Sequence, residues 1–131
     1  MARDRKNSGL KKLANKQILV VEDHPLLGEI LTAQLTLFDH RSHADSGKEA
    51  LNQIKWTRPN VVLLDLSLPD MNGLELARLL RQNETTKSIR ILAMSGSPMD
   101  KRNWLQAGCD DFILKPFSTS TLLARLSKLA A

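Results

Sequence analysis

Short apolar runs alternate with amphipathic stretches along most of the chain. Residues 18–21 and 61–64 are continuously apolar and rich in β-branched side chains, which is typical of strands buried on both faces. Residues 89–94 and 112–114 are further apolar runs that we interpret as strands. Residues 40–44 are more polar and predict an edge strand. The pattern therefore predicts five strands.

The stretches between these runs have apolar side chains at helical spacing and predict five helices. Pro25 is expected to begin the first, because proline is tolerated in the first turn, and the apolar face of this helix would extend to Phe38. The five helices are expected from Pro25, from Ser46-Gly47, from about Gly73, over 98–107 and over 118–129.

Alternating strands and helices indicate an α/β domain whose parallel sheet is covered on both sides. We expect a flavodoxin-like three-layer sandwich with five strands in the order 2-1-3-4-5 and five helices. At 131 residues the chain has the size of one domain, and no uncharged apolar run approaches the roughly 18 residues of a membrane span. The single cysteine, Cys109, and the lack of a secretory signal favour a cytoplasmic location.

Basic residues gather at the N-terminus. The net charge is +5, and residues 1–16 hold six of the nineteen Lys and Arg residues with one acid, whereas residues 17–131 hold thirteen residues of each sign. We therefore expect residues 1–16 to be a flexible basic arm and residues 17–131 to be the folded domain. Because the folded part is neutral, no nucleic-acid contact is expected within this chain.

Polar side chains follow four of the expected strands. Glu22 and Asp23 come after the first strand, Asp65 after the third, Ser95 after the fourth and Lys115 after the fifth. The carboxyl ends of parallel strands meet at one edge of the sheet, where ligands bind. Clustered carboxylates need a counter-charge, and Mg²⁺ supplies it, with Mn²⁺ as an alternative. Lys115 adds a second positive charge that can pair with Asp65 or a phosphoryl group.

Five segments of the chain resemble the receiver domain of response regulators, and the resemblance includes the receivers of chemotaxis regulators. They are VVEDHP at 20–25, ADSGKEAL at 44–51, VVLLDLSLPDMNGLEL at 61–76, AMSG at 93–96 and AGCDDFILKPF at 107–117. They occur in the family's order and span nearly all of residues 17–131. The resemblance implies a bacterial signalling switch of a two-component or phosphorelay system. Its only catalytic activity would be its own phosphorylation and dephosphorylation at Asp65.

The resemblance also implies a role for each residue of the site. Asp65 would be the phospho-acceptor, a carboxylate that attacks phosphorus and becomes an aspartyl phosphate. Mg²⁺ would be held by Glu22, Asp23, Asp65 and the main-chain carbonyl of Ser67. Lys115 would contact a phosphoryl oxygen, and its bond to Pro116 resembles the cis peptide of the family.

Ser95 resembles the hydroxyl residue that turns toward the phosphoryl group, and Phe112 resembles the aromatic residue that turns inward with it. The surface that reports the change would be the fourth helix, fifth strand and fifth helix, at about 98–129. The expected partners are a histidine kinase or histidine phosphotransfer protein, a downstream protein target and a second copy bound through this surface.

Two other functions are compatible with the same motifs. Glu-Asp-His-Pro at 22–25 resembles the start of regulators with a DNA-binding output domain, so the chain could be the receiver of a longer transcription regulator. A phosphatase with a nucleophilic aspartate is the second, but those enzymes carry an acid two residues after the nucleophile, where this chain has Ser67. The sequence does not identify the kinase, the target or the phosphate lifetime.

Single residues of these motifs also have plainer interpretations. Asp23 alone could be a helix N-cap, and Asp65 alone a turn residue at a strand end. His40 and His43 form an H-x-x-H pair that we interpret as solvated surface rather than as a metal site. Trp104 is expected to pack on the core.

Overall fold

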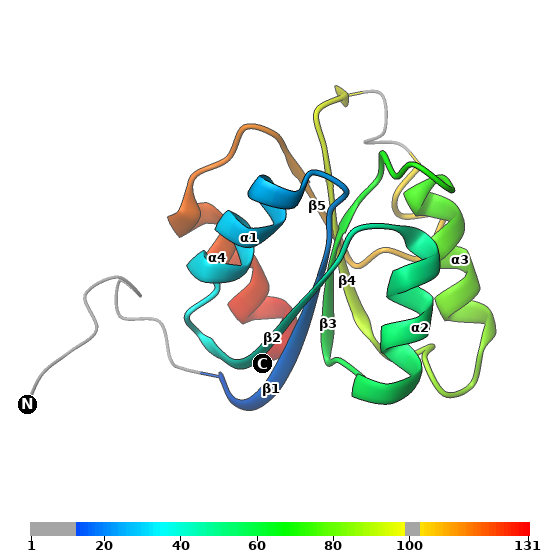
Figure 1. The fold of residues 1–131 in the computed structure, drawn as a ribbon, viewed down its shortest axis with the longest axis horizontal. Coiled ribbons are helices and arrows are strands. Elements are labelled where there is room, and N and C mark those ends of the chain that lie inside the picture. Colours follow the sequence, from blue (N-terminus) through cyan, green and yellow to red (C-terminus); the bar gives the residue numbers. More distant parts are fainter. Residues whose placement is uncertain (1–12, 99–102) are drawn as a thin grey trace, which may run out of the picture.

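The computed structural model describes residues 13–98 and 103–131 (Figure 1). Strands and helices alternate over most of this part of the chain. In chain order they are β1 (Leu13–Val21), α1 (Pro25–Gln34), β2 (Phe38–Ala44), α2 (Gly47–Thr57), β3 (Val61–Asp65), α3 (Gly73–Gln82), β4 (Arg90–Ser95), β5 (Asp111–Leu114) and α4 (Thr119–Ala130).

The five strands form one sheet in the order β2-β1-β3-β4-β5, and every neighbouring pair is parallel. The predicted strand order and fold class are therefore confirmed. Asp65 at the end of β3 lies opposite Met94 of β4, and Ser95 lies opposite Leu114 of β5. Because the strands run in one direction, the segments that follow them all leave the same edge of the sheet.

Helices cover both faces of the sheet, with α1 and α4 on one side and α2 and α3 on the other (Figure 1). Alternate side chains of β1 supply the two cores: Leu19 packs with α2 and α3, whereas Val20 packs with α1 and α4. All residues of β3 are buried. Burial of each large aliphatic side chain contributes roughly 1.5–3 kcal/mol, so the central strands are the main anchor of the fold.

Side-chain caps begin the helices at the predicted places. The hydroxyl of Ser46 accepts the Glu49 N–H at the start of α2, and the hydroxyl of Ser118 accepts the Thr121 N–H at the start of α4. Each cap satisfies a backbone donor that has no partner within the helix. Pro25 occupies the first turn of α1, as predicted.

The described residues contain four helices instead of the expected five. The expected helix at 98–107 falls partly on residues 99–102, which lie outside the described residues, and residues 103–108 form turns. The helix expected at 118–129 is therefore α4.

Two boundaries also differ from the prediction. Phe38 begins β2 instead of continuing the first helix, which ends at Gln34. Leu35, Leu37 and Phe38 are all buried. Their spacing resembles that of a helix face because the turn between α1 and β2 also packs on the core. β1 begins at Leu13, which pairs with Phe38, so the sheet includes residues assigned to the basic arm. An arm at residues 1–12 lies outside the described residues.

Candidate functional site

Three carboxylates lie together at the edge where β1 and β3 end. Glu22 and Asp23 directly follow β1, and Asp65 is the last residue of β3. One oxygen from each of the three lies within 4.8 Å of the others. Glu22 and Asp65 are buried, with 1% and 4% of their surface exposed, whereas Asp23 is exposed. The cluster is therefore accessible from solvent on the Asp23 side.

Lys115 supplies the cation of this cluster. Its Nζ lies 3.0 Å from Glu22 Oε1 and 3.0 Å from Asp65 Oδ2. The backbone holds it in place, because the Lys115 N–H donates to the carbonyl of Ser95 at 2.8 Å, next to a cis bond between Lys115 and Pro116. One ammonium thus faces two buried carboxylates, and Asp23 adds a third nearby.

The pKa values of Glu22 and Lys115 reflect this excess of carboxylates over ammonium groups. Burial raises the pKa of Glu22 from 4.5 to about 7, and so does the hydrogen bond that protonated Glu22 can donate to Asp65, although Lys115 acts in the opposite direction. Burial would lower the pKa of Lys115, but its hydrogen bonds to Asp65 and Glu22 outweigh burial and raise that pKa. The lysine therefore keeps its charge near neutral pH, whereas Glu22 takes up a proton more readily than an ordinary glutamate.

The donor atoms fit a hard divalent cation. Three carboxylate oxygens at this spacing are ligands that Mg²⁺ takes, usually with several waters retained. A charge of +2 would also relieve the repulsion between Glu22 and Asp65 that the single lysine leaves in place.

Two serines border Asp65. The N–H of Ser67 donates to Asp65 Oδ1 at 2.9 Å, which fixes one carboxylate oxygen while Lys115 fixes the other. Ser95 lies one residue beyond Met94, the partner of Asp65, and only 2% of its surface is exposed. Its Oγ accepts the N–H of Ser97 at 3.0 Å. The structure thus places Glu22, Asp23, Asp65, Ser67, Ser95 and Lys115 around one edge of the sheet.

Phe112 lies away from the carboxylates, in the core on the α2–α3 side. It stacks on Trp104, with ring centroids 6.3 Å apart and an interplanar angle of 16°. Trp104 is partly buried against the same core, as predicted, and Cys109 is buried there as well. The His43 ring lies 2.8 Å from the main-chain oxygen of Glu22 and packs over α1 at Gly28.

No role was predicted for Asp70 in the loop after Asp65, and Gly73 was predicted only as the start of a helix. The carboxylate of Asp70 accepts the N–H groups of Gly47 and Lys48, both at 2.9 Å, and so joins this loop to the start of α2. At Gly73 a Cβ would lie 2.7 Å from the carbonyl oxygen of Asp65, so only glycine allows α3 to begin this close. The Pro-Asp dipeptide and the Asn-Gly pair at 72–73 were the available signals.

The fold is a parallel five-stranded α/β sandwich with three carboxylates and a lysine at its carboxyl edge, the place where open α/β sheets bind ligands. Comparison with known proteins identifies the family directly, because residues 18–127 match the response regulator receiver domain. The chain belongs to this family. Receiver domains are phosphoryl-accepting switches of two-component signalling, phosphorylated by histidine kinases.

One relative is the DNA-binding response regulator MtrA of Mycolicibacterium smegmatis, 39% identical over 113 residues, which cover 85% of this chain and 49% of MtrA. The chain thus spans about half the length of the curated relatives it matches. Among solved structures, a response regulator from Chloroflexus aurantiacus superimposes with a TM-score of 0.82 at 30% identity, covering 92% of this chain and 98% of that one.

The receiver domain of the sensor histidine kinase PA1611 from Pseudomonas aeruginosa superimposes with a TM-score of 0.79 at 28% identity. The match covers 88% of this chain and 97% of the PA1611 receiver chain. That structure has a magnesium ion coordinated in its active site cleft. Within the described ranges, none of the helices here is long and apolar enough to cross a membrane.

Proposed function

We propose that Asp65 accepts a phosphoryl group from a phosphohistidine of a histidine kinase or phosphotransfer protein. The observation that carries this proposal is the pairing of Lys115 with Asp65 and Glu22, both at 3.0 Å, inside a cluster of three carboxylates. In the transfer, an Asp65 oxygen forms a bond to phosphorus as the phosphorus–nitrogen bond of the donor breaks. The result is an aspartyl phosphate and a free histidine on the donor.

The residues around Asp65 orient this reaction. The Ser67 N–H and the Lys115 ammonium each hold one Asp65 oxygen, so the carboxylate is already positioned before the donor arrives. Lys115 would then stay beside the phosphoryl oxygens and stabilise their charge.

The same proposal assigns a divalent cation, Mg²⁺ with Mn²⁺ as an alternative, to Glu22, Asp23, Asp65 and the main-chain carbonyl of Ser67. When bound, the ion neutralises charge on the transferring phosphoryl group. The three carboxylate oxygens within 4.8 Å and the magnesium in the related PA1611 receiver support this assignment.

The proposed switch uses Ser95 and Phe112. Ser95 would turn its hydroxyl to the phosphoryl group, and Phe112 would adjust its ring within the core beside Trp104. The surface over residues 98–129 would then change its affinity for a target protein or for a second copy. Because MtrA is DNA-binding and this chain matches 49% of its length, a longer DNA-binding regulator of the cytoplasm is the context we infer.

Incubation with acetyl phosphate and Mg²⁺, followed by intact-protein mass spectrometry, tests the assignment. Wild type should gain the mass of one phosphoryl group, and EDTA should prevent the gain. Asp65→Asn should gain none while keeping its far-UV circular dichroism spectrum. Asp45→Asn removes an exposed carboxylate outside the site and should react like wild type. Equal labelling of Asp65→Asn and wild type would refute Asp65 as the acceptor.

A further inference from the structure

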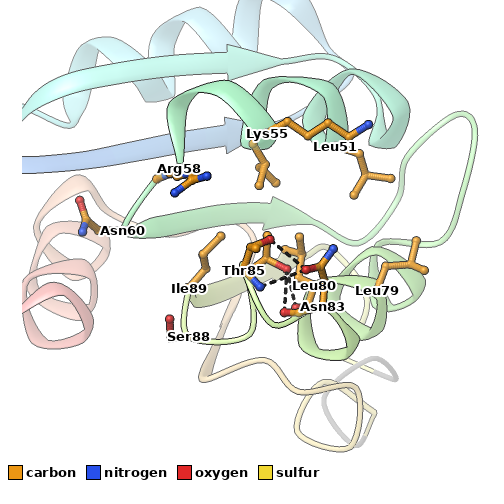
Figure 2. Close-up of a pocket in the computed structure, with 13 residues that line it drawn as sticks. Leu51, Lys55, Arg58, Asn60, Leu79, Leu80, Asn83, Thr85, Ser88 and Ile89 are labelled. Atoms are coloured by element: carbon orange, nitrogen blue, oxygen red, sulfur yellow. Dashed lines mark hydrogen bonds between the residues drawn. The ribbon is translucent and has the colours of Figure 1, made fainter.

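A pocket lies between α2 and α3 (Figure 2). It is at the end of the sheet where β3 and β4 begin, opposite the end that carries Asp65. Its volume is about 600 Å³, within the roughly 300–1,000 Å³ of small-molecule sites. Asn60, directly before β3, and Ile89, directly before β4, line it. The length of β3 alone separates it from the acidic cluster by roughly 13 Å. The pocket is therefore distinct from the phosphoryl site.

The inner wall of this pocket is apolar. Ile54 of α2 and Leu80 of α3 are 2% and 1% exposed, and Ile89 is 7% exposed. Leu51 and Leu79, which are less buried, extend this wall toward solvent on either side (Figure 2). A ligand that enters the pocket would cover apolar surface at its inner end.

The rim is polar and carries only positive charge. Lys55 and Arg58 lie on the α2 side, and none of the thirteen lining residues is acidic. Within the described part of the chain, neither cation has an ion pair or a side-chain hydrogen bond. On the other side, the side-chain Oδ1 of Asn83 accepts the N–H and the hydroxyl of Thr85, which leaves the side-chain NH2 group of Asn83 to donate to a ligand. The rim therefore offers donors and cations.

Arg58 adopts a backbone conformation that glycine usually supplies. It caps the C-terminus of α2 with φ 47° and ψ 65°, in the left-handed region. For a residue with a Cβ this conformation costs on the order of 1–2 kcal/mol, and glycine at this position avoids the cost. Such outliers gather at functional sites, and here the strained residue places its guanidinium on the rim of the pocket.

We propose that the α2–α3 pocket binds a small anionic amphiphile, a molecule with an apolar body and one carboxylate, sulfonate or phosphate group. The apolar body would contact Leu51, Leu80 and Ile89, and the anionic group would lie between Lys55 and Arg58 with Asn83 as a further donor. The absence of any acid from the lining favours an anion over a neutral or cationic ligand. The pocket shares no lining residue with the carboxylate cluster around Asp65.

Titration with 8-anilinonaphthalene-1-sulfonate tests the proposal, because this probe combines an aromatic body with one sulfonate and fluoresces when bound. Wild type should bind one equivalent saturably. In ¹⁵N-labelled protein, the amide shifts should be largest at Asn60, Asn83 and Thr85. The neutral analogue N-phenyl-1-naphthylamine should bind more weakly. Asp65→Asn should bind the sulfonate like wild type.

Two variants separate binding from folding. Arg58→Gly removes the guanidinium and the backbone strain together, so it should keep or raise Tm while weakening sulfonate binding by roughly fivefold. Lys55→Gln should weaken binding by a similar factor. Lys128→Gln removes an exposed cation of α4 and should have no effect. Equal affinity in wild type, Lys55→Gln and Arg58→Gly would overturn the proposal, as would amide shifts centred on Asp65 or no saturable binding.

Discussion

At the scale of single residues, the acidic cluster lowers the stability of the folded protein. Glu22 and Asp65 are buried side by side, and one lysine is shared between them at 3.0 Å from each. Two buried carboxylates and one ammonium leave an uncompensated negative charge, which costs free energy in a low-dielectric site. The raised pKa of Glu22 expresses this cost as proton uptake.

Glu22→Gln should therefore stabilise the metal-free protein at pH 8. Because the pKa of Glu22 rises from 4.5 to about 7 on folding, the folded state binds more protons between these values and loses stability as pH rises through them. We expect a gain of roughly 1–3 kcal/mol at pH 8 and almost none at pH 4. Urea unfolding in EDTA at both pH values measures it. A less stable variant at pH 8 would contradict this account.

Asp70 should show the opposite pH dependence. The N–H groups of Lys48 and Gly47 lower its pKa below the usual 3.8, so its contribution to stability is present above that value and is lost as pH falls below it. Asp70→Asn should lower Tm modestly at pH 7 and converge with wild type in acid, as measured by thermal unfolding. Glu29→Gln removes an exposed carboxylate of α1 as a control, and its difference in Tm from wild type should not depend on pH in this way.

At the scale of elements, Arg81 fastens α3 to the segments before β4 and β5. Its guanidinium donates to the carbonyls of Ile89 and Gly108 at 2.7 and 2.8 Å, and to the carboxylate of Asp110 at 2.9 Å. Gly108 has φ 99°, and a Cβ there would lie 2.6 Å from Arg81 Cγ. One side chain thus joins three segments of the chain.

Arg81→Met keeps the aliphatic part of the side chain but removes these hydrogen bonds. Partly buried acceptors would lose their donor, so we expect a loss of roughly 2–4 kcal/mol and faster amide exchange at Gly108. Arg78→Met on the exposed face of the same helix should change stability by less than about 0.5 kcal/mol. Urea unfolding of both variants checks this, and similar losses would show that Arg81 has no special role.

The same scale shows what the sequence can predict. Continuous apolar runs located the buried strands, and Ser46, Gly73 and Ser118 marked helix starts, because these signals are local. The strand β2 was predicted, but the boundary between α1 and β2 was misplaced, since Leu35 and Phe38 would be buried in a helix as well as in the turn and strand they form. The start of β1 at Leu13 was also missed, because Asn15 has a positive φ of 65° and the pairing with β2 shifts there.

The candidate site was predictable in part for the same reason. Strand ends located Glu22, Asp65 and Lys115, since parallel strands bring their carboxyl ends together whatever lies between them. The contact between Asp70 and the start of α2 depends on how a loop folds back, and no periodicity encodes that path. The position of Arg58 on the rim of a pocket could not be predicted either, because its left-handed conformation depends on where α2 ends.

At the scale of the whole molecule, the two tryptophans lie in very different places. Trp56 on α2 is 82% exposed, whereas Trp104 stacks on Phe112 in the core. If Phe112 moves when Asp65 is phosphorylated, Trp104 reports the change and Trp56 does not.

Beryllofluoride with Mg²⁺ mimics the aspartyl phosphate and should change tryptophan fluorescence through Trp104. Trp56→Phe should keep the saturable change, and Trp104→Phe should lose it. Asp65→Asn should lose it in either background. A change that follows Trp56 instead would place the moving part near α2 and would contradict a switch through Phe112.

The pairing of Lys115 with Asp65 also has a consequence during synthesis on the ribosome. The Asp65 carboxylate leaves the exit tunnel fifty residues before the lysine that faces it, since these partners are that far apart in sequence. The same ammonium pairs with Glu22 beside the first strand. A nascent chain that has not yet reached Lys115 therefore carries Glu22 and Asp65 without the ammonium that both carboxylates face in the folded domain.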